Sequence, residues 1–407
     1  FTSFYYEYSD IVAQFHEWMT GTGVLYIKKY APWIATVFTT HATVLGRCIS
    51  GHGRPLYGKL QEYNPAQMAR EFNVVAKQSL EKITANEADV FTTVSGLTSK
   101  ECSHFLGREV DLITPNGFED SFVPGPDDFE WKRIAAREKL HKVAEAVLGY
   151  KPAPDTFFIA TSGRYEFRNK GFDIFIDMLG ELNSKGDVSK ECIAFILVPA
   201  YHKGPRQDIS DFIYKNGPLP AGDKYMTHSL HYPESDPILR RIGERGLTND
   251  KNKKVKVIFV PSYLNGTDGI FNLSYYDLLI GFDITAFPSY YEPWGYTPLE
   301  SLMFHIPTVT TTLSGFGLWV KEHFQNPDNA ISIVERRDDN ESEVISSICQ
   351  YTSSIISLDE KGIAEVRNKA YEISRIAMWD SFVSHYFTAY NKSLSVSFER
   401  RNEPREF

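Results

Sequence analysis

Cysteine is scarce in this sequence, and no cysteine pair has the spacing of a metal site. Four cysteines, Cys48, Cys102, Cys192 and Cys349, are scattered over 407 residues without a CxxC motif. This pattern argues against a zinc site and a disulfide framework, and it favours a reducing compartment. Ligand-spaced clusters of Asp or His are also missing from the sequence, and HEWMT does not match the HExxH zinc motif, so we expect no metal site.

Long apolar runs and basic blocks are absent as well. No window of about 18 apolar residues occurs, which argues against a membrane-spanning helix. The first residues, FTSFYYEYSD, lack the basic start and apolar stretch of a secretory signal, so we expect a cytoplasmic protein. The formal net charge is −9 without a basic block, so the sequence offers a nucleic acid no electrostatic surface to bind.

What the sequence does contain is typical of a folded α/β protein. Hydrophobic residues make up 42% and aromatic residues 14% of the chain, and its length suggests two domains. Short β-branched and aromatic runs alternate with segments of helical spacing, which indicates parallel strands buried on both faces. The runs are PWIATVFTTH, ADVFTTVS, VDLITPNG, DTFFIATSG, CIAFILVPA, VKVIFVPSY, FDITAFPSY and IPTVTTT. Helical spacing occurs at 64–85, 129–148, 171–182, 342–356 and 363–376.

A cluster of residues that break regular structure predicts where the domains divide. The cluster VPGPDD at 123–128 follows the third strand-like run and reads as a linker. We therefore expect a first domain at 1–125 and a second domain at 126–380. The aromatic-rich segment 381–407 should form a helix that packs back on the first domain. A polar region at 201–254 interrupts the second domain as an insertion with a short helix or two.

The stretch SYYEPWGYTPLE at 289–300 places two glutamates eight residues apart. Thr297 suits an N-cap, Pro298 suits the first helical position and Glu300 can reach back to the cap, which predicts a helix beginning at Thr297. The free N–H groups of such a helix could hold an anion. Glu292 lies at the carboxyl end of a predicted strand, where ligands bind in open α/β sheets. The residues alone leave open whether Glu300 only caps the helix.

Cationic side chains gather near other strand ends. The segment GRYEFRNKG offers Arg164 and Lys170 after a predicted strand, and the run TVFTTH ends at His41. Cations in a dry cleft would stabilise the charge of a departing phosphate. They could equally be solvated loop charges, and a lone histidine is more often structural. The segment GTGVLY lacks the third glycine of a dinucleotide-binding loop.

These strings resemble the glycogen synthase family of the type found in animals and fungi. The string FPSYYEPWGYTPLE, followed by IPTVTTTLSGFG, carries the resemblance. It is supported by FHEWMTGTG, FTTHATVLGR, VFTTVS, TPNGF, GRYEFRNKG, SDPILRRIGERGL and VKVIFVPSYL, so that it covers nearly the whole chain. The resemblance implies a retaining glucosyltransferase of α/β fold, with two Rossmann-like domains facing a central cleft (the GT-B architecture).

The resemblance also implies roles for matching residues. The matching residues Arg164 and Lys170 are expected to bind the nucleotide diphosphate, assisted by Arg47. His41 lies beside the anomeric carbon, where its backbone carbonyl can stabilise an oxocarbenium-like sugar. Glu292 helps to hold the glucose hydroxyls.

Further positions complete the predicted site, on the donor or acceptor side of the cleft: Trp294, Gly295, Thr297, Glu300, Tyr275 and Glu17. The backbone around Trp294 and Gly295 is expected near the glucose, and Thr297 near the phosphate. Tyr275 matches a tyrosine that stacks on uracil, although a core aromatic is nearly as plausible. Glu17 matches a glutamate on the acceptor side.

The implied activity is transfer of glucose from UDP-glucose or ADP-glucose to the nonreducing end of an α-1,4-glucan. We expect no cofactor, no nucleic acid and no membrane partner, and the oligomeric state, including a homo-oligomer, stays open. One alternative is an inactive relative that only binds glucan. Another is a glycoside hydrolase that uses Glu292 and Glu300 as its carboxylate pair.

Two regions depart from the family pattern. Its members begin with a strand and a Gly-Gly loop that closes over the donor, and nothing before Phe15 resembles it, so we expect a first domain truncated at its N-terminus. The relatives also carry an arginine-dense helix that senses glucose 6-phosphate. The matching region, DEKGIAEVRNKAYEISRIAMWD, has only Arg367 and Arg375, which predicts little or no activation by the sugar phosphate.

Overall fold

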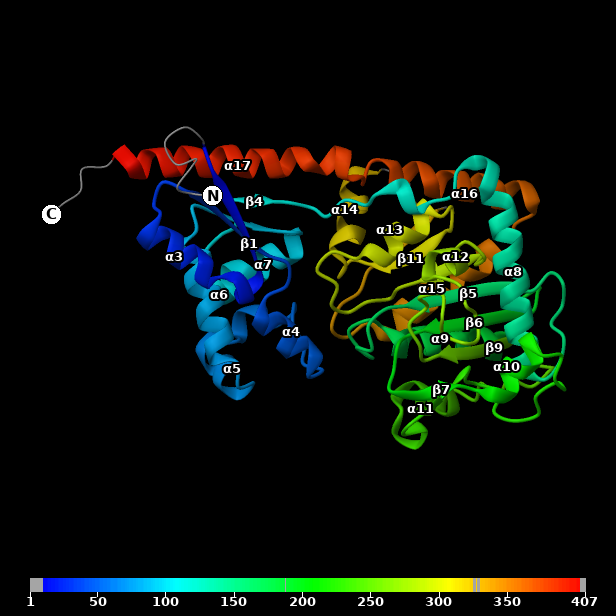
Figure 1. Ribbon diagram of the computed structural model, residues 1–407. Coiled ribbons are helices and arrows are strands. Elements are labelled where there is room, and N and C mark those ends of the chain that lie inside the picture. The colour runs from blue at the N-terminus through cyan, green and yellow to red at the C-terminus, as the bar shows by residue number, and fades with distance from the viewer. Residues whose placement is uncertain (1–9, 187, 325–326, 328–329, 403–407) are drawn as a thin grey trace.

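Two α/β domains lie side by side in the computed structural model (Figure 1), which describes residues 10–186, 188–324, 327 and 330–402. The first domain contains a four-stranded parallel sheet in the order β1-β2-β3-β4. Its strands are β1 (Val12–His16), β2 (Ala35–Thr40), β3 (Val90–Thr93) and β4 (Leu112–Ile113). The helices are α2 (Glu17–Thr20), α3 (Thr22–Tyr30), α4 (Val44–Gly51), α5 (Pro65–Glu71), α6 (Val75–Glu87) and α7 (Gly96–Leu106).

The second domain contains a six-stranded parallel sheet in the order β12-β11-β10-β5-β6-β9. Its strands are β5 (Phe157–Ser162), β6 (Cys192–Leu197), β9 (Val255–Val260), β10 (Ile284–Ala286), β11 (Thr308–Thr311) and β12 (Ile331–Val334). Its helices are α8 (Pro126–Leu148), α9 (Phe172–Lys185), α12 (Tyr275–Leu279), α13 (Tyr296–Met303), α14 (Gly315–His323), α15 (Glu341–Ile356) and α16 (Glu360–Arg375). The α/β class predicted from the alternating pattern is confirmed.

The order of this sheet creates a topological switch point. From β5 the chain builds outward through β6 and β9, and then returns to place β10 on the other side of β5. Loops that leave two such neighbouring strands part in opposite directions, and a crevice opens between them at the carboxyl edge. The segments after β5 and β10 are GRYEFRNKG and the start of SYYEPWGYTPLE, the two stretches singled out from the sequence.

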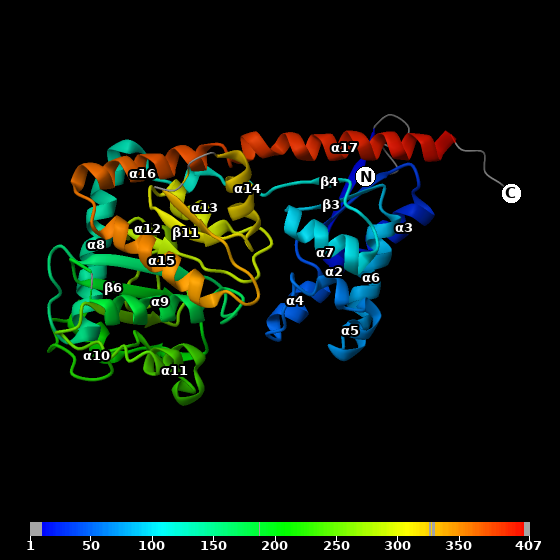
Figure 2. The same cartoon turned by 180° about the vertical axis from the view of Figure 1, so that it is seen from behind.

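A long C-terminal helix ties the second domain to the first. Helix α17 (Trp379–Asn402) runs along the first domain in both views (Figures 1 and 2) and contacts β2 most extensively. The hydroxyl of Tyr390 donates to Gln14 at 2.6 Å, and Lys392 pairs with Asp111 at 2.7 Å. No described helix combines the length and the apolar character needed to cross a bilayer.

The structure differs from the sequence-based expectations in three local respects. The expected helix at 64–85 is broken into α5 and α6, because Asn73 adopts a left-handed conformation with φ of 55°. Edge strands β1 and β12 were not predicted, since each is only partly buried and lacks a continuous apolar run. The insertion contains α10 (Gln207–Tyr214) and α11 (Pro237–Glu244), and also an antiparallel pair, β7 (His202–Pro205) and β8 (His228–Leu230).

Candidate active site

Lys170 and Glu292 form an ion pair at the switch point of the second sheet. Their side chains, each 14% exposed, approach from the loop after β5 and the loop after β10. Two glycines lie against the pair: a Cβ on Gly163 would be in ordinary contact with Lys170 Cδ at 3.6 Å, and one on Gly295 would crowd Glu292 Cγ at 3.2 Å. Lys170 and Glu292 therefore lie between the Arg164 loop and the start of α13.

The start of α13 differs from the prediction. The helix begins at Tyr296 with Gly295 as its N-cap, and no side chain caps it, so the predicted start at Thr297 and the capping role of Glu300 are wrong. Gly295 has φ of 110°, which lets the chain turn into the helix two residues before the predicted cap. Pro298 is still tolerated in the first turn, because the N–H groups there have no partner within the helix.

The backbone around Trp294 is held by the neighbouring strand–helix connection. The amide of Phe316 and the hydroxyl of Ser314 both donate to the carbonyl of Trp294, at 2.7 and 2.9 Å. The amide of Gly315 donates to the carbonyl of Glu292 at 3.0 Å. The indole of Trp294 is buried against Phe316 and other aromatic rings.

Glu300 lies in α13, where it meets α12 instead of the helix cap. Its Oε1 accepts a hydrogen bond from the hydroxyl of Tyr276 at 2.9 Å. Burial raises the pKa of Glu300 from 4.5 to about 7. Glu300 and Glu292 thus have different partners, Tyr276 and Lys170.

This pKa makes the stability effect of Glu300→Gln depend on pH. Since the folded pKa lies above the ordinary value, ionised Glu300 costs stability as pH rises from about 4.5 to about 7. Glutamine keeps an acceptor for Tyr276 and never ionises. The free energy of unfolding of the variant, relative to wild type, should therefore rise by about 2 kcal/mol between pH 5 and pH 8. Urea titrations at the two pH values measure this difference, and equal differences at both would contradict it.

Glu166 links the remaining predicted cations. Its Oε1 lies 3.0 Å from Arg164 and 3.8 Å from Arg47, so that it joins the two domains. A cavity of about 420 Å³ opens beside it, lined by Arg47, Gly51 and Gly53 of the first domain and by residues 165–169 of the second. The side chains of Arg47 and Arg164 are 44% and 61% exposed, so solvent reaches both of these Glu166 partners. Sequence reasoning missed Glu166, although it lies between Arg164 and Lys170 in GRYEFRNKG.

His41 and Glu17 lie together in the first domain. His41 follows β2 directly, and its amide donates to Glu17 Oε1 at 2.9 Å. Glu17 has φ of 63°, an uncommon conformation for a residue with a side chain, which indicates that its place is fixed by its surroundings. His16 Nδ1 lies 2.9 Å from His41 Nε2. Burial and the neighbouring His16 lower the pKa of His41 to about 4, so its ring is neutral near pH 7.

Tyr275 begins α12 close to the Arg164 loop. Its hydroxyl shares a hydrogen bond of 2.9 Å with Ser162, the last residue of β5. The ring is half-buried and packs against the core of the second domain. Its position is compatible with both interpretations, a core aromatic and a platform for a base.

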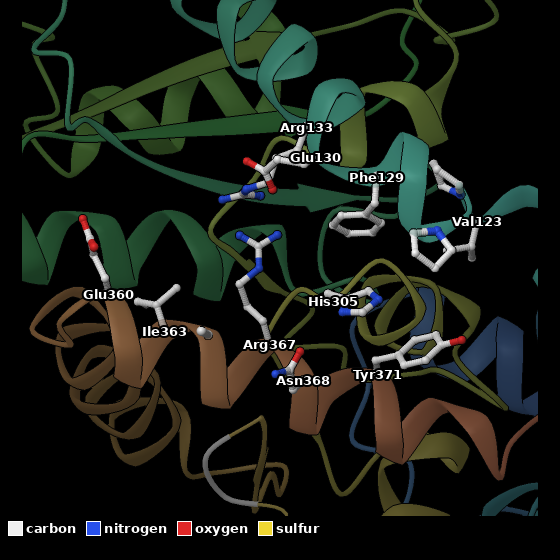
Figure 3. Close-up of a pocket in the computed structure, with 13 residues that line it drawn as sticks. Val123, Phe129, Glu130, Arg133, His305, Glu360, Ile363, Arg367, Asn368 and Tyr371 are labelled. Atoms are coloured by element: carbon white, nitrogen blue, oxygen red, sulfur yellow. The ribbon is translucent and has the colours of Figure 1, made fainter.

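The region that matches the arginine-dense helix forms α16 and lines a cavity of about 540 Å³ (Figure 3). Arg133 and Arg367 point toward one another across it. Arg133 pairs with Asp283 at 2.9 Å, and Arg375 pairs with Asp120 at 2.6 Å. Arg367 Nη2 has no hydrogen-bond partner among the described residues, and burial together with Arg133 lowers the pKa of Arg367 to about 9.

Comparison with solved structures identifies the architecture. Sucrose-phosphate synthase from Thermosynechococcus elongatus matches with a TM-score of 0.57 and 13% identity, over 97% of this chain and 76% of its own. The catalytic domain of starch synthase IV from Arabidopsis thaliana, bound to ADP and acarbose, matches with a TM-score of 0.57 and 15% identity, over 95% and 73%. These likenesses confirm the predicted GT-B fold.

Comparison with known sequences identifies the family. The glycogen synthase family matches residues 1–205 and 213–406. The glycogen [starch] synthase of Neurospora crassa is 30% identical over 98% of this chain and 64% of its own length. The liver enzyme of Rattus norvegicus is 30% identical over 95% and 63%. The chain thus spans a little under two thirds of these relatives, and it belongs to the glycogen synthase family.

Proposed function

We propose that this chain transfers glucose from a nucleotide-glucose donor to the 4-hydroxyl at the nonreducing end of an α-1,4-glucan, with retention of anomeric configuration. One observation carries the proposal: Lys170 and Glu292 pair at the switch point, beside the start of α13, while Arg47 lines a cavity between the domains and Arg164 pairs with Glu166 on its other side. Membership in the glycogen synthase family supports it.

The cations stabilise the leaving group. As the bond between the anomeric carbon and the phosphate oxygen breaks, negative charge develops on the nucleoside diphosphate. This charge is stabilised by Arg47, Arg164 and Lys170 and by the first amides of α13, which lie at the positive end of the helix dipole. In a cleft from which water is expelled, such fixed charges act at low effective dielectric.

The sugar is held and attacked from the side of the leaving group. Glu292 accepts hydrogen bonds from glucose hydroxyls, and the His41 carbonyl faces the oxocarbenium-like carbon. Because the His41 ring is neutral, it adds no positive charge beside that carbon. The acceptor 4-oxygen, on the side of Glu17, bonds to the anomeric carbon, and its proton passes to the departing phosphate.

We propose UDP-glucose as the donor, with ADP-glucose as the alternative. The family of animal and fungal type favours UDP, and a neighbouring fold, Anabaena HepE, was solved with UDP, whereas the Arabidopsis starch synthase domain was solved with ADP. Kinetics with both donors, side by side, decide between them. We also propose a cytoplasmic location, in keeping with four free cysteines among the described residues.

Incubation with glycogen and UDP-glucose tests the proposed function. We expect nucleoside diphosphate release that matches glucose incorporation into glycogen. Release of reducing ends would instead indicate a hydrolase, and binding without turnover would indicate an inactive glucan-binding relative.

We expect chelation to leave the transfer rate unchanged. Three cationic side chains and a helix N-terminus can supply the charge that a divalent ion supplies in other transferases. Rates measured with and without EDTA, after dialysis, check this. A rate that is lost with EDTA and restored by Mg²⁺ or Mn²⁺ would show that the cationic side chains alone do not stabilise the leaving group sufficiently.

We expect glucose 6-phosphate to leave the rate unchanged as well. Asp283 pairs with Arg133 and Arg137, and Asp120 pairs with Arg375, so these guanidinium groups already have carboxylate partners. Arg367 alone is a weak site for a dianionic phosphate. Initial rates at subsaturating donor, with and without the sugar phosphate, measure the effect, and a severalfold increase would overturn the expectation.

A further inference from the structure

The buried carboxylate of Glu101, on α7 of the first domain, accepts hydrogen bonds from both domains. Its Oε2 accepts from the Thr43 hydroxyl at 2.6 Å and from the Tyr291 hydroxyl at 3.1 Å. Its Oε1 accepts from the Tyr57 hydroxyl at 2.9 Å. Thr43 and Tyr57 belong to the first domain, and Tyr291 belongs to the second. A single carboxylate oxygen therefore joins the two sides of the cleft.

On the first-domain side, this oxygen reaches the helix that carries Arg47. Thr43 is the N-cap of α4, and its hydroxyl accepts from the amide of Gly46 at 3.0 Å while it donates to Glu101. Thr43 also lies two residues after His41. Space beside the carboxylate is fully used, since a Cβ on Gly46 would lie 2.0 Å from Glu101 Oε2. Movement of Glu101 would therefore disturb the turn between His41 and Arg47.

On the second-domain side, the bond reaches the residue next to Glu292. Tyr291 is 2% exposed, and its amide donates to the carbonyl of Asn169 at 3.1 Å. Asn169 precedes Lys170 and Tyr291 precedes Glu292, so this backbone bond joins the residues next to the two members of the Lys170–Glu292 pair. Its hydroxyl crosses the domain boundary to Glu101. Burial raises the pKa of Glu101 from 4.5 to about 7, so the carboxyl group is fully ionised only above that pH, where hydrogen bonds to it are strongest.

We propose that Glu101 is a positioning residue for the transfer reaction, which sets the place of His41 and Arg47 relative to Lys170 and Glu292 when the cleft is closed. The proposal rests on the proposed function. Glu101 itself is buried and touches no substrate. Its effect passes through Thr43 on one side and Tyr291 on the other.

Two matched variants test this proposal. Tyr291→Phe and Tyr57→Phe each remove one hydroxyl from the same carboxylate, but only the first removes a bond between the domains. We expect Tyr291→Phe to lower kcat about tenfold, with the KM for the donor nearly unchanged, because one hydrogen bond to the buried carboxyl group is lost from the closed state. Tyr57→Phe should keep kcat within about twofold of wild type, while both lose similar thermal stability. Equal kcat in the two variants would overturn the proposal.

Small-angle scattering tests the positioning role of Glu101 independently of the proposed function. With saturating UDP, Tyr291→Phe should have a larger radius of gyration than Tyr57→Phe and wild type. If wild type shows no glucose transfer, the proposed function fails, and the scattering comparison still decides whether the Tyr291–Glu101 bond holds the domains together. Identical radii would refute that role.

Discussion

Replacing Lys170 with alanine is expected to lower kcat with UDP-glucose and glycogen about a hundredfold or more. Lys170 is the largely buried cation at the switch point, and its ammonium group would stabilise the departing phosphate in a dry cleft. Removal of this charge raises the barrier to bond cleavage, and it also leaves Glu292 without its partner. Initial rates at saturating donor and acceptor measure the loss.

A second lysine–glutamate pair provides the control for this experiment. Lys185, at the other end of α9, pairs with Glu181 at 2.6 Å and has a side chain that is 49% exposed. Lys185→Ala should leave kcat near wild type, because an exposed pair contributes little and lies outside the cavity. A near-normal rate for Lys170→Ala would refute its assignment to the leaving group.

Replacing Glu292 with glutamine should lower kcat about ten- to a hundredfold, because one charged hydrogen-bond acceptor for the sugar is lost. Glutamine has nearly the same shape, so the loop after β10 should keep its conformation. Lys170 would also lose its ionic partner, and it would then be free to bind diphosphate more tightly. We therefore expect UDP binding to persist or strengthen while turnover falls.

The matched control for Glu292→Gln is Glu181→Gln, which removes the charge of the exposed pair on α9. Calorimetric titration with UDP and initial rates, measured on both variants, separate binding from turnover. Loss of UDP binding together with turnover in Glu292→Gln would show that Glu292 maintains the fold of the site. Wild-type turnover in that variant would remove Glu292 from the mechanism.

The strand runs and the two loops at the switch point could be predicted from the sequence because their signals are local. Parallel strands buried on both faces appear as continuous apolar runs, and the chain order then places the segments after β5 and β10 at one edge. Strands β1 and β12 give no such signal, because their side chains are only partly buried and neither forms a continuous apolar run. The N-cap of α13 was misplaced by two residues, since the left-handed conformation of Gly295 decides the helix start rather than the hydroxyl of Thr297.

Contacts between distant segments could not be predicted in this way. Glu166 lies within a segment that the sequence had singled out, but its role depends on Arg47, which belongs to the other domain. The bond between Glu101 and Tyr291 joins residues 190 positions apart. Hydrogen-bond partners at such separations depend on how the two domains pack together. A single sequence does not record the distance between the domains or their relative orientation.

A structure of the chain with UDP bound tests the central claim most directly. We predict that one diphosphate contacts the side chains of Arg164 and Lys170 and the first amides of α13, with Arg47 approaching from the opposite domain. A diphosphate bound away from the switch point, or one that contacts only a single member of this set, would contradict the account.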